Sequence, residues 1–470
     1  MRFLLTILVC ANCIGASYYV DSTASGSQDG SSWANAWTNV TQCTGLSAGD
    51  TVWISGGSAG STNTYYLTAY WNPAAGSSGN PITYKISPDI GYNGHVEFEM
   101  SGTGINFLGA FNHVTISGDA GDGNRHMSLK SGDHAIYGNG ANGGNTIEYF
   151  DFGTREKFFY WNTGAGVTMN NCRAYKWQSS AKDNIIFTYN TTETAYDSIV
   201  FTNCFFYAPR TATTGYGDDL AKDMGTGVSF YNCYFEGYTT NYVYGQHQDG
   251  IQWLRGNYGK VIGNTFRNIG NYAVFCEAYH GGFTNVVVAN NLAYIDYSEL
   301  QGTTAPQGFV IAEGAGYISG KGTNSFFRDV VLANNNVIDY GAHKAFSLTP
   351  AGTGSTADCV FWNNVAANSS GTWTIHSTVS TNYNVMLDTT AAASAFTTYS
   401  EFGTNDYTPD SADTVLLDQG GNLSSYFTDD ITGATRSGTW DIGAYEFGAG
   451  GGDPPAEVVP TAVVGTLRAL

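Results

Sequence analysis

Short segments in which apolar and polar residues alternate recur through the middle of the chain, and each leads into an asparagine. Gly166-Val-Thr-Met-Asn-Asn-Cys and Val286-Val-Val-Ala-Asn-Asn-Leu are two examples. A period of two indicates β-strands, and no helical periodicity lies between these segments. The asparagine returns at intervals of 26 to 44 residues, at Asn171, Asn203, Asn232, Asn264, Asn290, Asn334 and Asn363.

This repeat predicts a parallel β-solenoid from about Thr51 to Asn384. One repeat cannot bury its own apolar face, so successive repeats stack as rungs. We expect the seven asparagines to form one column at a corner, where each amide hydrogen-bonds the next. We assign this ladder a structural role and no part in function.

Three of the asparagines are followed directly by a cysteine: Cys172, Cys204 and Cys233. Adjacent rungs lie about 4.8 Å apart, a separation that a disulfide permits. Side chains in register on parallel strands point the same way, which rarely gives the torsion that a disulfide needs. We therefore expect a stack of buried thiols.

The composition narrows the class of protein. Charged residues make up only 12% of the chain, and Asp and Glu outnumber Lys and Arg by 39 to 19, a net charge of −20. That charge excludes a nucleic-acid partner. An apolar content of 42% excludes a disordered chain, and the 60 glycines have no three-residue period, which excludes collagen. What remains is an all-β protein rich in glycine and aromatic residues.

The first 17 residues are typical of an export signal. Met1-Arg2 supplies a positive start, Phe3 to Val9 an apolar core, and Ile14 to Ser17 small residues for cleavage. No stretch of 18 apolar residues follows, so no transmembrane segment is expected. We predict a secreted or cell-surface protein, monomeric, with a β domain over 18–448 and a Gly/Pro linker and short tail over 449–470.

Both ends of the β domain strengthen a resemblance to a known family. The openings Tyr18-Tyr-Val-Asp-Ser and Leu46-Ser-Ala-Gly-Asp-Thr-Val-Trp-Ile, and the closing Thr435-Arg-Ser-Gly-Thr-Trp-Asp-Ile-Gly-Ala-Tyr-Glu, accompany the repeat. Together they resemble the right-handed parallel β-helix, or pectin-lyase-like, superfamily of secreted bacterial type. The resemblance implies a single-stranded right-handed parallel β-helix, with capping segments at both ends and an extracellular polysaccharide as partner. No catalytic signature of a named subfamily maps onto the chain.

A second strand column aligns at Gly250-Ile-Gln-Trp, Ala273-Val-Phe-Cys, Gly308-Phe-Val-Ile and Ala345-Phe-Ser-Leu. The second and fourth members are mostly large and apolar, so they are expected to face the core. The first members would then face solvent and form a flat floor for a sugar chain. The alternative is that small residues suit a corner where the chain enters the strand.

Candidate acid/base residues lie beside this column. His247 and Asp249 are two residues apart, so both can face one side, and a carboxylate can orient a histidine for proton transfer. Asp249-Gly250 as a simple turn capped by His247 is the alternative. Arg255 is the nearest cation that follows in this strand.

One rung earlier, Asp218, Asp219 and Asp223 form an acidic loop that could bind Ca²⁺ together with Asp249. Lys222 lies among these carboxylates and is a candidate base if burial lowers its pKa. A solvated acidic loop is the alternative.

The remaining candidates are residues that could contact a sugar by hydrogen bonds or stacking: Gln252, Phe275, Glu277, His280, Tyr244 and Tyr279. Asp249 and Glu277 are expected to lie on the order of 16 Å apart along the sheet. A glycosidase needs its two carboxyl groups within about 10 Å, so these two are not expected to form a catalytic pair.

Two classes of function stay open. The first is an enzyme that cleaves an extracellular polysaccharide by β-elimination or hydrolysis. The second is a non-catalytic adhesin or glycan-binding protein that uses the solenoid as a rigid stalk. The fold does not decide between them.

Overall fold

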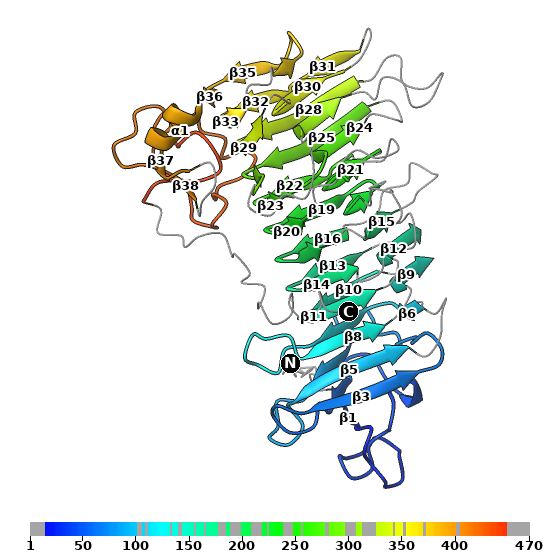
Figure 1. Cartoon of the computed structure of the whole chain (residues 1–470). Helices are drawn as coiled ribbons and strands as arrows, with labels where there is room; N and C mark the ends of the chain where they lie inside the picture. Colours follow the sequence, from blue (N-terminus) through cyan, green and yellow to red (C-terminus); the bar gives the residue numbers. More distant parts are fainter. Residues whose placement is uncertain are drawn as a thin grey trace, which may run out of the picture.

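The structure is a computed structural model, and it is an elongated stack of short strands that form three parallel sheets (Figure 1). It describes residues 15–100, 106–108, 111–131, 134–139, 143–154, 157–163, 166–176, 185–188, 199–207, 219–222, 225–237, 248–254, 257–277, 282–296, 307–312, 326–341, 344–350, 354–369, 373–400 and 405–448.

Each sheet contributes one strand to most rungs, and the sheets are called A, B and C in the order in which a rung visits them. Sheet A contains β1 (Ser17–Val20), β2 (Thr51–Ile54), β4 (Ile82–Ile86), β7 (Val114–Ser117), β10 (Asn145–Glu148), β13 (Val167–Asn170), β16 (Ile199–Thr202), β19 (Val228–Tyr231), β22 (Lys260–Ile262), β25 (Gly282–Ala289), β28 (Phe326–Ala333), β31 (Ser355–Ala357), β32 (Val360–Trp362) and β35 (Ser380–Asn382). Sheet B contains β3 (Thr62–Leu67), β5 (His95–Met100), β8 (Met127–Ser131), β11 (Phe150–Thr154), β14 (Arg173–Lys176), β17 (Phe205–Tyr207), β20 (Tyr234–Glu236), β23 (Thr265–Arg267), β26 (Leu292–Tyr294), β29 (Asn336–Gly341), β33 (Val365–Ser369) and β36 (Val385–Leu387). Sheet C contains β6 (Asn106–Leu108), β9 (His134–Asn139), β12 (Lys157–Thr163), β15 (Ile186–Thr188), β18 (Ala221–Lys222), β21 (Ile251–Trp253), β24 (Tyr272–Glu277), β27 (Gln307–Ala312), β30 (Phe346–Thr349) and β34 (Thr374–Ile375).

In the described part of the chain, four further elements lie outside the three sheets. They are the 3₁₀ helix η1 (Val40–Gln42), helix α1 (Thr389–Ala395) and the antiparallel pair β37 (Phe396–Thr398) and β38 (Asp406–Pro409). Within the three sheets every strand pairing of the described residues is parallel. The predicted parallel β-helix is confirmed. None of the described helices is long and apolar enough to cross a membrane.

The core is the interior of the stack, where side chains of equal position pile up from rung to rung. Phe201 and Phe230 stack with their centroids 5.0 Å apart, and Phe235 and Phe266 at 4.8 Å. Strict register places identical residue types over one another, which is why aromatic pairs recur along the axis. This stacking explains why 14% of the residues are aromatic, a larger share than the 12% that are charged.

The asparagine column differs from the prediction in one member. Six of the predicted residues have a left-handed backbone, with φ between 51° and 58°, at the short turn between sheets A and B: Asn171, Asn203, Asn232, Asn290, Asn334 and Asn363. In the remaining rung that position is Gly263, with φ of 72°. Asn264 belongs to the next column. Asparagine and glycine tolerate this conformation better than other residues, so the turn explains the repeat.

A continuous amide ladder is formed by the neighbouring column, which is buried. The Nδ2 of Asn264 donates to Oδ1 of Asn291 at 3.0 Å, and Asn291 donates to Asn335 at 2.9 Å. The ladder continues through Asn364 to Asn384. Each amide also donates to a carbonyl of the preceding rung, as Asn264 does to Phe230.

The cysteine column is the lower part of this same ladder. The backbone N–H of Cys233 donates to Oδ1 of Asn264 at 2.8 Å, and the Cys233 thiol lies 3.5 Å from the carbonyl oxygen of Phe201. Cys172 and Cys204 take equivalent positions, and all three are buried free thiols, as expected. Burial raises the pKa of the Cys172 and Cys233 thiols. Thiol and amide thus fill one structural role in successive rungs.

The C-terminal segment folds back as a lateral cap, at the upper left of Figure 1. Its apolar residues Leu423, Phe427 and Trp440 pack on Val287 and Val331, on the outer face of sheet A. A second cluster covers the outer face of sheet B with residues that include Phe396, Tyr407, Leu416 and Ile442. Strands β25 and β28 are apolar on both faces because one face meets the core and the other meets this cap.

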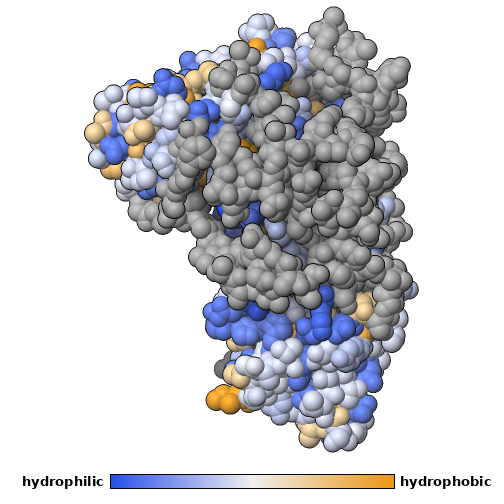
Figure 2. Space-filling view, viewed as in Figure 1, coloured by the Kyte–Doolittle hydropathy of each residue, from blue (hydrophilic) through white to orange (hydrophobic). Residues whose placement is uncertain are grey.

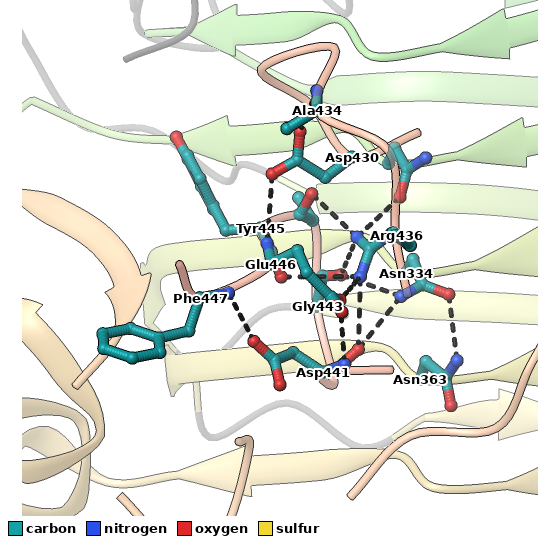
Figure 3. A network of polar contacts seen from close by, with 12 residues as sticks. Asn334, Asn363, Asp430, Ala434, Arg436, Asp441, Gly443, Tyr445, Glu446 and Phe447 are labelled. Carbon is teal, nitrogen blue, oxygen red and sulfur yellow. Dashed lines mark hydrogen bonds and ion pairs between the residues drawn. The ribbon is translucent and has the colours of Figure 1, made fainter. Parts of the chain in front are cut away.

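Arg436 is the centre of the cap, and its guanidinium is fully buried (Figure 3). It donates to the carbonyl oxygens of Gly443 and Ala444 at 2.8 and 2.9 Å and pairs with Glu446 at 2.9 Å. The turn asparagines hold the same segment, because Asn334 donates to the carbonyl of Gly443 at 2.9 Å. The turn asparagines at the corner between sheets A and B therefore hold the cap against the stack of rungs.

Candidate functional site

The candidate site is built on the outer face of sheet C. Strand pairing places Lys222 beside Gln252, Gln252 beside Phe275, Phe275 beside Val310, and Val310 beside Ser347. These five residues form the outer column of sheet C. The residues on either side of Gln252 and Phe275 face the core, so the predicted alternation is confirmed: Ile251, Trp253, Val274 and Cys276 are all buried.

The predicted solvent-facing floor is wrong. Gly250, Ala273, Gly308 and Ala345 do stack, but they are buried at the corner where the chain enters sheet C. A Cβ on Gly250 would lie 2.4 Å from the carbonyl oxygen of Ala273, and one on Gly308 only 2.2 Å from that of Ala345. Small residues are required because neighbouring rungs approach closely, so the corner explanation holds. A bulky side chain at Gly250 or Gly308 would disturb the fold.

Two carboxylates from successive rungs hold that corner. Asp219 is 3% exposed and accepts a hydrogen bond from the backbone N–H of Asp249 at 2.9 Å. Asp249 is fully buried and accepts from Asn271 Nδ2 at 2.8 Å and from the backbone N–H of Tyr272 at 3.1 Å. Each carboxylate thus ties its rung to the next. These contacts are structural. They agree with the alternative prediction that Asp249-Gly250 is a turn.

Lys222 joins this corner to the outer column. Its Nζ donates to Oδ2 of Asp219 at 3.0 Å, and its side chain is 34% exposed. A buried carboxylate beside an ammonium favours the charged form of the lysine. The pair therefore holds the Lys222 ammonium at the edge of the surface, where the buried Asp219 carboxylate balances its charge.

An aromatic pair lies two rungs above Lys222. Tyr272 and Phe275 are stacked with their centroids 4.3 Å apart and their planes 16° from parallel. Both are partly exposed, and so is Glu277 at the end of the same strand. Sequence reasoning found Phe275 and Glu277 but missed Tyr272 and Asn271. The corner at Ala273 puts two consecutive residues inward, so Tyr272 shares a face with Phe275 despite the odd spacing.

The remaining predicted site residues lie outside the described part of the chain. They are His247, Arg255, Tyr244, Tyr279, His280, Asp218 and Asp223. Their roles stay predictions. Among the described residues no group of three or more His, Cys, Asp or Glu could hold a metal ion. A calcium site at Asp218, Asp219 and Asp223 therefore stays a prediction.

The surface in the view of Figure 2 is mostly hydrophilic or neutral where its residues are described, with only scattered hydrophobic positions.

The fold defines the class of protein: a parallel β-helix, a fold that it shares with a solved pectate lyase. Pectate lyase Pel9A superposes with a TM-score of 0.52 at 16% sequence identity, covering 92% of this chain and 96% of its own. A rhamnogalacturonan lyase gives a TM-score of 0.41 at 16% identity, with coverages of 79% and 87%. PfbA, a surface adhesin of Streptococcus pneumoniae, gives 0.32 at 11% identity, with coverages of 74% and 84%. No family model and no curated protein matches the sequence.

Proposed function

We propose that this is an exported protein that binds an acidic extracellular polysaccharide at Lys222, Gln252 and Phe275 on the outer face of sheet C and cleaves it by β-elimination. One observation supports the proposal most strongly. A lysine anchored to a buried carboxylate, an amide and an aromatic ring occupy three successive rungs, at Lys222, Gln252 and Phe275. Rungs are about 4.8 Å apart, a spacing comparable to that of the units of an extended sugar chain.

The chemistry of elimination matches these groups. A base removes the proton on the carbon next to the substrate carboxylate, a C=C bond forms, and the C–O bond to the leaving sugar breaks. The leaving oxygen takes up a proton from water or from the protonated base, and the other product has an unsaturated end. A cation must first neutralise the carboxylate so that the proton becomes acidic. The Lys222 ammonium can pair with the substrate carboxylate. Lys222 can act as the base only if substrate binding separates it from Asp219, because that carboxylate favours the charged form of the lysine.

Hydrolysis fits the described residues less well. It requires two carboxyl groups that reach the glycosidic bond. Asp219 and Asp249 are neighbours, but both are buried and both hold backbone N–H groups of the next rung. A hydrolytic pair would have to include a residue such as Glu277, which is partly exposed.

The proposal includes a Ca²⁺ ion that promotes binding of the acidic polysaccharide. A protein with a net charge of −20 repels a polyuronate, and screening is incomplete at a Debye length of about 8 Å in physiological salt. A Ca²⁺ ion bound by Asp218 and Asp223 would attract the substrate and neutralise its carboxylate. Asp219 could join them only by giving up its ion pair with Lys222. We expect EDTA to lower activity, because Lys222 alone would then face the polyanion.

Incubation with a panel of polygalacturonate, alginate and neutral xylan tests the proposal. Growth of ultraviolet absorbance from unsaturated ends marks elimination, and reducing ends without that absorbance mark hydrolysis. Retention on one polysaccharide without any cleavage would favour the adhesin alternative. The proposed function fails if none of the three is bound or cleaved.

A further inference from the structure

We infer that Gln252 is a specificity-determining residue whose side-chain oxygen accepts a hydrogen bond from a sugar hydroxyl of the bound polysaccharide. The inference rests on the proposed function and deepens it. It assigns one recognition contact to one atom.

The observation that carries it is an unsatisfied buried acceptor. Gln252 is 6% exposed, and its Oε1 is buried with no hydrogen-bond partner among the described residues. The residue does not point into the core, because its strand neighbours Ile251 and Trp253 do. Its amide therefore lies on the outer face of sheet C, between Lys222 and Phe275.

Such an atom is costly in a free protein. A buried carbonyl oxygen that loses its hydrogen bond to water costs about 1–3 kcal/mol when nothing replaces the bond. The other polar residues of this face avoid that cost: the hydroxyl of Ser347 donates to the carbonyl of Thr374 at 3.2 Å, and the Lys222 ammonium donates to Asp219. Gln252 is the exception in this column among the described residues.

The neighbours of Gln252 identify the class of ligand. Phe275 offers an aromatic surface on one side and Lys222 a cation on the other, and both are partly exposed. An apolar ligand would leave the oxygen unpaired, and a carboxylate would repel it. A sugar unit supplies what both neighbours and the oxygen require: C–H groups for stacking and an O–H donor for Oε1.

The decisive variant is Gln252→Met, which has a similar length and volume but no acceptor. We expect its melting temperature to be equal to or higher than that of the wild type, because an unsatisfied acceptor is removed. We expect its affinity for the polysaccharide of the panel that the wild type binds to fall about tenfold, the loss of one hydrogen bond. Ser61→Ala is the control, since it removes a satisfied hydroxyl donor away from sheet C: the Ser61 hydroxyl donates to the carbonyl oxygen of Ser58 at 2.6 Å. It should lower the melting temperature and leave affinity unchanged.

The outcomes separate the inference from the proposed function. If the wild type binds polygalacturonate, alginate or xylan and Gln252→Met binds it equally well, the inference is overturned and the proposed function survives. If Gln252→Met melts at a clearly lower temperature, a water or another partner satisfies Oε1 in the free protein, which also overturns the inference. If the wild type binds none of the panel, both fail together.

Discussion

At the scale of single residues, Lys222 carries the most chemistry and gives the sharpest test of mechanism. We expect Lys222→Ala to lower turnover by about 10²–10⁴, the usual contribution of a general acid or base. Lys222→Arg keeps the charge, but a guanidinium does not give up its proton. Recovery of turnover in the arginine variant would assign Lys222 to charge neutralisation, and failure to recover would assign it to proton abstraction.

Lys260 provides the control for that experiment, because it lies on the outer face of sheet A, in register with Ser229 and away from sheet C. Lys260→Ala should leave turnover unchanged. Equal losses in both variants would show that a cation anywhere on the molecule matters, and would contradict the assigned site.

His95 connects one residue to the pH dependence of stability. Its Nε2 lies 2.8 Å from the Ser128 hydroxyl oxygen, and burial lowers its pKa below the ordinary value of 6.5. The unfolded state therefore takes up the proton first as pH falls, so stability decreases below about pH 6.5. We expect His95→Gln to reduce the drop in melting temperature between about pH 7 and pH 5. An unchanged drop would contradict this assignment.

At the scale of elements, the buried amide ladder should contribute more to the free energy of unfolding than exposed asparagines do. Asn335 receives hydrogen bonds from Asn291 and donates to Asn364 and to the carbonyl of Val288. Asn335→Ala leaves buried partners unsatisfied, at about 1–3 kcal/mol for each lost group. We expect a large fall in the denaturant midpoint. The exposed Asn382→Ala should change it little, and comparable effects would refute the ladder's role.

The strand pattern and the repeat could be predicted from the sequence because both follow from local rules. Alternation fixes which residues face the core, and a left-handed turn admits asparagine or glycine at a fixed position. Asn264 was misplaced because consecutive Asn-Asn pairs elsewhere hide which of the two occupies the turn. The small-residue column was misjudged for another reason. Whether a glycine faces solvent or a neighbouring rung depends on how the corner bends, and alternation says nothing about that.

The site was predictable only in part. Lys222, Gln252 and Phe275 share a face because register aligns them, and the aligned tetrapeptides already contained that register. The sequence pattern does not predict that Tyr272 shares this face, because the bend at Ala273 breaks the period of two. The hydrogen bond from the Asp249 backbone to the Asp219 carboxylate is not predicted either. The two residues lie in separate loops, and no local sequence pattern indicates that they are in contact.

At the scale of the whole molecule, the cap should determine stability. Arg436 is fully buried, and burial lowers its pKa despite the opposing carboxylate of Glu446. Arg436→Met would remove the cation that pairs with Glu446 and one hydrogen-bond donor from each of the carbonyl oxygens of Gly443 and Ala444. Breaking a buried ion pair costs about 3–5 kcal/mol, so we expect a marked fall in melting temperature and exposure of the apolar faces of sheets A and B. A dye that binds hydrophobic surface would report that exposure, and an unaltered dye signal would contradict it.

The change of the ladder column from cysteine to asparagine has a consequence for how such a protein can vary in length. Thiol and amide fit the same place, so a rung carrying either residue can be inserted beside either kind of neighbour. An added rung on the N-terminal side of Lys222 would lengthen the stack by about 4.8 Å and leave the candidate site and the cap unchanged relative to each other. The length of the solenoid can therefore change by whole rungs during evolution, while the residues of each existing rung keep their contacts.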